Sequence, residues 1–352
     1  MTQDAWSKIA DNVQTLNIGL MGVQSHIIEA VIALLLSSVG GLLIGPIAGR
    51  AVPFFWILCD MLFGGLGERL DKPKRRALVL VGRGIFLTVL VLGFSALVGG
   101  LLETLCALEP LKGLAPVLFL CLFFASGSVW FALGRLYRVM DEGNPKYKAR
   151  QKGGYYAMAR STRINLAVGD AYGIARAGLG FVATSFDKGV VAPAFWYILG
   201  GFTALGLYSG LSFLVWRFGK RGFTKGFGRV PIFLERVMGI VPSFLSALCL
   251  IWAALFTPTA KLHRGFVALW GRKNRAPYEE GGWPLSALAW SLSVSLGGAV
   301  QEITGSAIQG VWVGPENATA RIGHRHLRRG LYISVIAHLL FFALLLGCYK
   351  GL

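Results

Sequence analysis

A short segment rich in glycine and basic residues separates two apolar stretches in the second half of the chain. Its sequence, WRFGKRGFTKGFGR, covers residues 216–229 and carries four glycines. Glycines allow close approach of the backbone and leave amide groups accessible, and arginine and lysine side chains bind phosphate oxygens. The segment therefore predicts a site for a phosphate-bearing ligand, with attraction to anionic lipid headgroups as the alternative. Its cations are Arg217, Lys220, Arg221, Lys225 and Arg229.

Ionisable residues inside apolar stretches form a second group of candidates. Asp60 and Arg83 lie in neighbouring apolar segments and could form an ion pair, and His338 lies in the last apolar stretch. An ionisable side chain at membrane depth is a functional candidate by default, although a hydrogen bond to a neighbouring helix is the simpler role for a single imidazole. The sequence has no glycine-rich nucleotide loop, nucleophile elbow or zinc-protease motif.

The composition identifies the class of protein that must position these residues. Hydrophobic residues make up 55% of the 352 residues and charged residues 15%, a balance that a single water-soluble globule cannot bury. Aromatic residues lie in the apolar stretches and do not alternate with basic ones, which argues against nucleic-acid binding. A bilayer core of about 30 Å needs roughly 20 apolar residues in helical form. The sequence therefore predicts an all-α membrane protein with about five to seven membrane segments. The strongest candidates are residues 27–47, 77–102, 114–136, 190–215, 237–256 and 330–348.

Basic loops between the apolar segments constrain the topology. Loops rich in lysine and arginine normally face the cytoplasm, but simple alternation of the spans cannot place all of these loops on that side. We expect residues 190–215, interrupted by Gly200 and Gly201, to enter the membrane and return, since irregular backbone is tolerated where it lines a protein cavity. A basic loop that faces outward is the alternative. Residues 52–67 are apolar but short, which fits a re-entrant or tilted piece.

The chain is expected to form a single membrane domain over residues 1–352. Residues 1–25 form a polar N-terminal segment without the basic start and apolar centre of a secretory signal, so the first span itself is expected to direct insertion. Residues 137–188 form a basic cytoplasmic loop, within which residues 155–186 fit an amphipathic helix lying against the membrane surface. The five cysteines have no metal-ligand spacing, and we expect free thiols.

Three segments together carry a resemblance to a known family. DKGVVAPAFWYILGG at residues 187–201, FLERVMGIVPSFLSAL at 233–248 and GGWPLSALAW at 281–290 resemble motifs of the CobD/CbiB family, integral membrane proteins of cobalamin biosynthesis. The family motif ETxAEN(x2)DGVVAPLFW is matched in its second half, from Gly189 to Trp196. The resemblance extends in register over residues 54–298.

The chain departs from the family motifs mainly at acidic and amide positions. Where the family has the two glutamates and the asparagine of ETxAEN, this chain has Gly180, Thr184 and Ser185, and Lys188 takes the place of the following aspartate. Leu285 replaces the glutamate of a GWPE motif. Such groups bind Mg²⁺ with a nucleotide or act as general bases. Further replacements lie at Gly65, Ser212, Val215 and Arg236.

The resemblance implies a ligase of the bacterial inner membrane that uses ATP and Mg²⁺. It would join adenosylcobyric acid to an aminopropanol phosphate through an amide bond, so that its partners are a corrinoid and a phosphate-bearing small molecule. For that reaction Glu235, Asp60 and Asp187 would act as metal-binding or basic groups. Phosphate would be held by Arg217, Lys220, Arg221, Arg229, Arg236 and Lys188.

The loss of acidic residues beside retained packing residues supports a different class of function. A non-catalytic scaffold, regulator or lipid- or phosphate-binding protein on the same fold would need neither ATP nor Mg²⁺. The acids would then have structural roles: Asp187 would cap a helix started by Pro193, and Glu235 would pair with Arg229 or Arg236.

Overall fold

The structure, a computed structural model, is helical apart from its connecting loops and one short pair of strands. It describes residues 3–72, 75–108, 113–140, 147–165, 171–219, 226–271, 274–301 and 307–351. Within these residues β1 (Ala299–Gln301) and β2 (Ala307–Gln309) pair antiparallel. Six helical stretches of the described chain are long and apolar enough to cross a membrane. The predicted all-α class is confirmed, and the protein is a multi-pass integral membrane protein.

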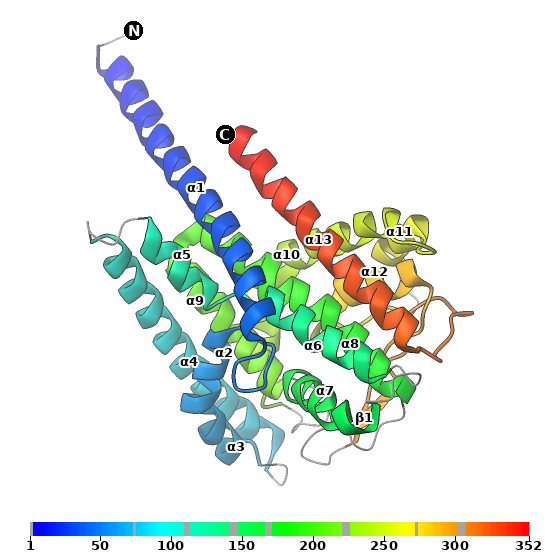
Figure 1. The fold of residues 1–352 in the computed structure, drawn as a ribbon. Coiled ribbons are helices and arrows are strands. Elements are labelled where there is room, and N and C mark those ends of the chain that lie inside the picture. The colour runs from blue at the N-terminus through cyan, green and yellow to red at the C-terminus, as the bar shows by residue number, and fades with distance from the viewer. Residues whose placement is uncertain are drawn as a thin grey trace.

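The strong spans predicted from the sequence all correspond to helices (Figure 1). The first is the stretch Gly22–Ile44 of helix α1 (Gln3–Ile44). The others are α4 (Ala77–Cys106), α5 (Leu114–Cys121) with α6 (Ser126–Val139), α8 (Ala171–Phe186) continuing through the π-helical turn η3 (Asp187–Val191) into α9 (Ala192–Phe218), α10 (Arg229–Leu255) and α13 (His324–Gly351).

The helix expected over residues 114–136 is interrupted between α5 and α6. The Leu122 carbonyl accepts a hydrogen bond from the Phe55 amide at 3.1 Å, and the Ala125 amide donates to the Gly189 carbonyl at 3.1 Å. These bonds replace those that the backbone loses where it leaves the helix. They also join the interruption to α2 (Phe54–Cys59) and to η3. α2 continues through the π-helical turn η1 (Asp60–Gly64) into α3 (Gly65–Leu70), which occupies the short apolar stretch before α4.

The chain reverses direction at Gly200 and Gly201, inside α9. Gly201 has φ 61° and ψ −156°, a conformation that is accessible almost only to glycine. Lys188 and Ser212, on opposite sides of the reversal, both contact the carboxylate of Glu235. A straight helix would separate residues so far apart in sequence by about 36 Å. The helical run therefore folds into a hairpin with one arm ending at Leu199 and the other beginning at Phe202, and the predicted return of this segment is confirmed.

Pro193 is the second residue of α9, as expected for a helix start, but it does not open a separate helix. α8, η3 and α9 follow one another without a gap, so the first arm of the hairpin begins at Ala171. The wide π-helical turn directly before the proline relieves the clash that its ring would make with a carbonyl of the preceding turn. The range 137–188 contains two helices, α7 (Tyr147–Thr162) and α8, and α8 packs inside the protein against α13.

Small residues let α4 lie close to the second arm of the hairpin. A Cβ atom added at Gly206 would come within 2.7 Å of the Ser95 carbonyl oxygen, and one added at Gly99 within 2.6 Å of the Phe202 carbonyl oxygen. Close backbone approach at glycine is a common means of helix association in membranes. The hairpin also contacts α10, which in turn packs against α13.

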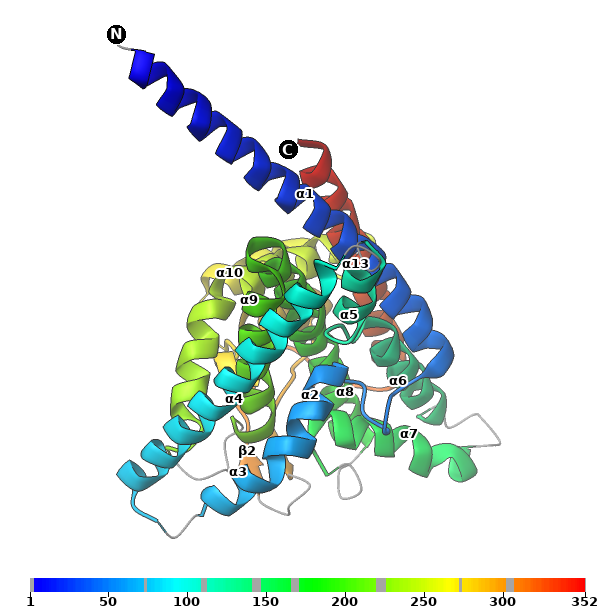
Figure 2. The same cartoon turned by 90° about the vertical axis from the view of Figure 1, so that its left-hand side faces the viewer.

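The remaining elements connect α10 to α13. α11 (Leu262–Trp270) is followed by the 3₁₀ turn η4 (Tyr278–Glu280), α12 (Gly282–Leu292) and the strand pair. α12 packs on α10 and α11. Both views place the two chain termini at one end of the molecule and α3, α7 and the strand pair at the other (Figures 1 and 2).

Candidate functional site

A cavity of about 210 Å³ lies beside the hairpin. Its wall is mostly apolar and comes from the segment before α2, the end of α7, α8 with η3, the second arm of the hairpin, the start of α12 and the chain beside the strand pair. We call it the central cavity. The polar and charged side chains in its wall are Ser161, Thr162, Arg176, Thr184, Ser185, Lys188, Glu279 and Glu280.

Six of the positions that depart from the family motifs meet at this cavity. Gly180, Thr184, Ser185 and Lys188 reach it from the first arm of the hairpin, and Leu285 reaches it from α12. Val215, from the second arm, is the sixth, and the glycine pair Gly297 and Gly298 also lines the cavity. The place where the resemblance leads us to expect carboxylates is thus built here from small, hydroxyl-bearing and apolar side chains with one lysine.

Lys188 forms a buried ion pair with Glu235 of α10. Its Nζ lies 2.8 Å from Oε2 of Glu235, and the Ser212 hydroxyl donates to Oε1 at 2.8 Å. The Lys188 Nζ lies 4.8 Å from the centre of the Tyr278 ring, and the Tyr278 hydroxyl donates to the Glu235 carbonyl at 3.1 Å. Burial raises the pKa of Tyr278, so this donor stays protonated. Because Glu235 is fully buried and Lys188 lines the cavity, the pair presents a charge-balanced ammonium group there.

Asp187, next to Lys188, is held by two serines of α10. The Ser243 hydroxyl donates to Oδ2 at 2.7 Å and the Ser246 hydroxyl to Oδ1 at 2.9 Å. The residue lies inside a continuous helical run, so its backbone position is not that of a helix cap, and the expectation of a cap is wrong. Its structural role is to join η3 to α10.

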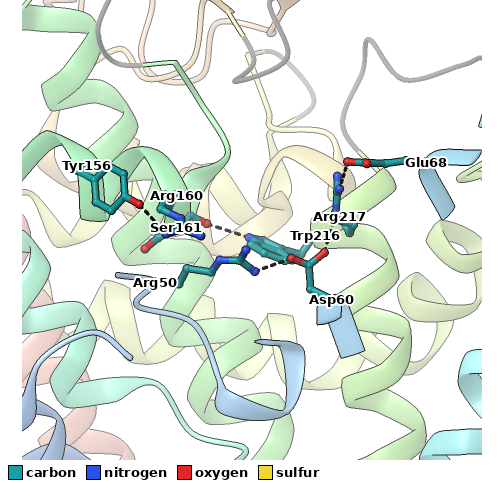
Figure 3. Close-up of polar contacts among 8 residues, drawn as sticks. All are labelled: Arg50, Asp60, Glu68, Tyr156, Arg160, Ser161, Trp216 and Arg217. Carbon is teal, nitrogen blue, oxygen red and sulfur yellow. Dashed lines mark hydrogen bonds and ion pairs between the residues drawn. The ribbon is translucent and has the colours of Figure 1, made fainter. Parts of the chain in front are cut away.

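Asp60 lies in a separate cluster between two arginines (Figure 3). Its Oδ2 is 2.5 Å from Nη1 of Arg50, and its Oδ1 is 2.8 Å from Nε of Arg217. Arg217 also pairs with Glu68 of α3. Arg83, suggested by the sequence as a partner of Asp60, instead donates to the Leu70 carbonyl at 3.2 Å. The cluster ties η1 and α3 to the end of the second hairpin arm.

The other predicted phosphate-binding residues are less concentrated. Arg229 and Arg236 are exposed on α10, and Glu235 pairs with Lys188 in place of either of them. Lys220 and Arg221 lie outside the described residues. The structure therefore brings Asp187, Lys188 and Glu235 together and brings Asp60 together with Arg217.

The three acids that the resemblance implies for catalysis do not form a site that fits Mg²⁺. No group of three or more histidine, cysteine, aspartate or glutamate residues in the described chain is placed to share an ion. Asp60 and Glu235 are each bonded to cationic side chains, and both carboxylate oxygens of Asp187 accept from serines. Magnesium needs several oxygen ligands around one position, and these oxygens already have other partners.

The partners of these acids were not predicted from the sequence. Arg50 lies before the first matching segment. Ser243 and Ser246 lie in an apolar span, where a serine does not by itself indicate a site. The spacing of Ser243 and Ser246 by three residues, on one face of a helix, was the available signal. Nothing in the local pattern of Arg50 pointed to Asp60.

Comparisons with known proteins agree with the resemblance. The model of the CobD/Cbib protein family matches residues 50–333. A cobalamin biosynthesis protein CobD from Sinorhizobium sp is 29% identical over 256 residues, which cover 70% of this chain and 76% of the relative. The protein of that name from Rhodobacter capsulatus is 30% identical over 130 residues, 37% of this chain and 40% of the relative. No solved structure matches the chain. Because the family match spans the central cavity and both clusters of acids, the chain belongs to the CobD/CbiB family.

Proposed function

We propose that the protein acts in cobalamin biosynthesis in the bacterial cytoplasmic membrane, at the step that forms adenosylcobinamide phosphate. The observation that carries the proposal is the convergence of separate family segments on one cavity. Residues 180–189, Leu285 and residues 297–298 lie far apart in the sequence and line the same space. Family membership and the names of the relatives support the same pathway.

The size of the cavity suits the reacting end of the substrates. Pockets for drug-sized ligands measure roughly 300–1,000 Å³, so a cavity of about 210 Å³ takes an aminopropanol phosphate or one side chain of a corrinoid. Lys188 and Arg176 supply cations in its wall, and Ser161 and Thr162 supply hydroxyl groups. We assign Lys188 to the phosphate-bearing ligand and Glu235 to holding the Lys188 side chain in place.

The proposal assigns no step to a metal ion held by Asp60, Asp187 or Glu235, because the oxygens of these acids already have other partners. Of the three acids proposed as catalytic, Glu235 binds Lys188 of η3, and Asp187, also in η3, accepts from Ser243. Asp60 binds Arg217 in the separate arginine cluster. We assign these carboxylates to fixing cations and helices around the cavity.

The experiment that tests the proposal fills the cavity. A Cβ atom added at Gly180 would meet only the Leu285 side chain, at 3.8 Å, so Gly180→Leu extends into the cavity without a backbone clash. In a strain that lacks its own adenosylcobinamide-phosphate synthase, the wild-type chain should restore product, measured by mass spectrometry, and Gly180→Leu should abolish it. Gly93→Leu, at an exposed position of α4 with open space around it, is the matched control.

Purified protein gives the second measurement. Wild-type protein in detergent, with adenosylcobyric acid, aminopropanol phosphate and Mg-ATP, should form the amide product. A folded wild-type protein that forms no product in the strain and in vitro would contradict the proposal. Equal amounts of product from Gly180→Leu and from the wild type would show that the reaction site lies outside the central cavity.

A further inference from the structure

Two glutamates of η4 line the central cavity. Glu279 and Glu280 are half-buried and belong to its wall, and neither is among the three acids that the resemblance implies for catalysis. The same wall contains the cationic side chains of Lys188 and Arg176. The cavity therefore presents charges of both signs to a ligand.

The turn that carries the two glutamates is tied to the protein on both sides. The Tyr278 hydroxyl donates to the Glu235 carbonyl at 3.1 Å, which joins η4 to α10. The Val311 amide donates to Oε2 of Glu280 at 3.0 Å, which joins η4 to the chain that follows β2. The carboxylates are thus held at fixed positions in the cavity wall, as a recognition site requires.

Close packing after the turn places these acids beside a position where a family carboxylate is missing. Gly281, directly after Glu280, has φ 124°, and a Cβ atom added there would lie 2.9 Å from Cβ of Leu285. Leu285 stands where the family motif has a glutamate, and it lines the same cavity. η4 therefore brings two carboxylates to the part of the wall from which that glutamate is absent.

Lys188 lies close to the same turn. Its Nζ is 4.8 Å from the centre of the Tyr278 ring, and Tyr278 directly precedes the two glutamates. A ligand in this cavity meets an ammonium group on one neighbour of the turn and carboxylates on the turn itself. A small molecule with one anionic and one cationic end complements both.

The interactions of the two glutamates within the protein are compatible with a ligand. Both residues interact with other groups of the chain. An ionised carboxylate has about four acceptor positions on its two oxygens, so a carboxylate that the protein holds in place still accepts from the N–H groups of a ligand. Hydrogen bonds from an ammonium group to a carboxylate are about twice as strong as those between neutral groups.

We propose that Glu279 and Glu280 bind the amino group of a small ligand whose phosphate group contacts Lys188. A primary alkyl amine is protonated at neutral pH, so an aminopropanol phosphate carries the matching pair of charges. A site built to bond an amine rejects an analogue that lacks one, because its polar groups then lose a partner. The inference rests on the proposed function, which assigns the phosphate to Lys188, and adds the residues that recognise the amine.

The test compares two phosphates on the purified full-length protein in detergent. One is aminopropanol phosphate, and the other is propyl phosphate, which keeps the carbon chain and the phosphate group but has no amine. In calorimetric titrations at constant ionic strength, the wild type should bind the first at least about tenfold more tightly, because charge-assisted bonds to the amine are added.

Glutamine at both positions removes the negative charges and keeps an acceptor oxygen for the Val311 amide. Glu279→Gln combined with Glu280→Gln should lower the preference for the amine to less than about twofold. Its affinity for propyl phosphate should stay at least equal to that of the wild type, which also shows that the variant is folded. Glu316→Gln, the same change at an exposed position, should keep the tenfold preference.

A wild type that does not distinguish the two phosphates, or a double variant that keeps the preference, would overturn the proposal. If the double variant binds neither phosphate, the single changes Glu279→Gln and Glu280→Gln decide. At least one of them should lose preference while it still binds propyl phosphate, and an unchanged preference in both would overturn the proposal.

The binding test contains no corrinoid or ATP, so its result is independent of the reaction. A wild type that restores product in the strain but binds both phosphates equally would contradict this inference and leave the proposed function standing. A preference for the amine that depends on the two glutamates, in a protein that forms no product, would support the inference and contradict the reaction.

Discussion

The buried Lys188–Glu235 ion pair places a charged side chain in the wall of the cavity. Both groups are buried, and each is a direct partner of the other at 2.8 Å. Removing one member of a buried pair leaves an uncompensated charge, which typically destabilises a protein by about 3–5 kcal/mol. We therefore expect Glu235→Gln to lower the free energy of unfolding by about that amount, measured by denaturant titration in detergent micelles.

The double variant distinguishes charge from packing. Glu235→Gln combined with Lys188→Met removes both charges, and its stability should return most of the way to that of the wild type, because no lone charge remains buried. Glu316→Gln, at an exposed position, should change the stability by less than about 0.5 kcal/mol. A double variant as unstable as the sum of its single changes would show that the two residues are not coupled.

The sequence predicts several residues of the candidate site, but it does not predict the side chains to which they bond. The family motifs predict Asp187, Lys188 and Glu235 as site residues, and the structure brings them together. Their bonds to Ser212, Ser243 and Ser246 depend on how η3 faces α10, which no local periodicity encodes. Asp60 pairs with Arg50 only because the segment before α2 turns back beside η1. Such contacts follow from tertiary packing and not from spacing along the chain.

The hairpin is the element that decides where the cavity lies. Gly201 has a backbone conformation that other residues rarely adopt, and a Cβ atom there would lie 2.6 Å from Oε1 of Glu103. This carboxylate accepts from the Thr203 amide at 3.0 Å and so caps the start of the second arm. Gly201→Ala should lower the free energy of unfolding by about 1–3 kcal/mol through backbone strain alone, and by more if the cap is displaced.

A glycine in a regular helix is the control for this prediction. Gly93 lies in α4 with open space around its Cα atom, so Gly93→Ala should leave the stability unchanged or raise it by up to about 1 kcal/mol. Thermal unfolding of both variants in the same detergent gives the comparison. Equal midpoints for Gly201→Ala and the wild type would mean that the reversal does not need its glycine.

The sequence predicts the elements whose position depends on hydropathy alone. It does not predict those whose position depends on tertiary packing. The spans and the reversal at the glycine pair followed from apolar length and from glycine. The interruption between α5 and α6 lies in a uniformly apolar stretch, and it exists because Leu122 and Ala125 bond to Phe55 and Gly189. The helical run continues through Pro193 because a π-helical turn precedes it, and no sequence pattern predicts that turn.

In the whole molecule, the hairpin brings the basic segments on either side of it to the same end. Because the run from Ala171 to Phe218 reverses at Gly201, the start of α8 and the end of α9 lie at one end, together with the end of α3, the start of α4 and the start of α13. Figures 1 and 2 place α3 and α7 at the end opposite to both chain termini. Because basic loops normally remain in the cytoplasm, both termini are expected on the non-cytoplasmic side.

Cys348 offers a direct test of this orientation. It is an exposed free thiol in the last turn of α13, whereas Cys59 and Cys249 are buried. In intact cells a membrane-impermeant maleimide should label the wild-type protein, and Cys348→Ser should lose most of that label. A cysteine placed at Arg138, exposed at the opposite end of the molecule, should react in the Cys348→Ser background only after the membrane is permeabilised. The reverse pattern would place the basic loops outside the cell membrane, which would remove the cavity from cytoplasmic ATP and corrinoids and would contradict the proposed function together with the topology.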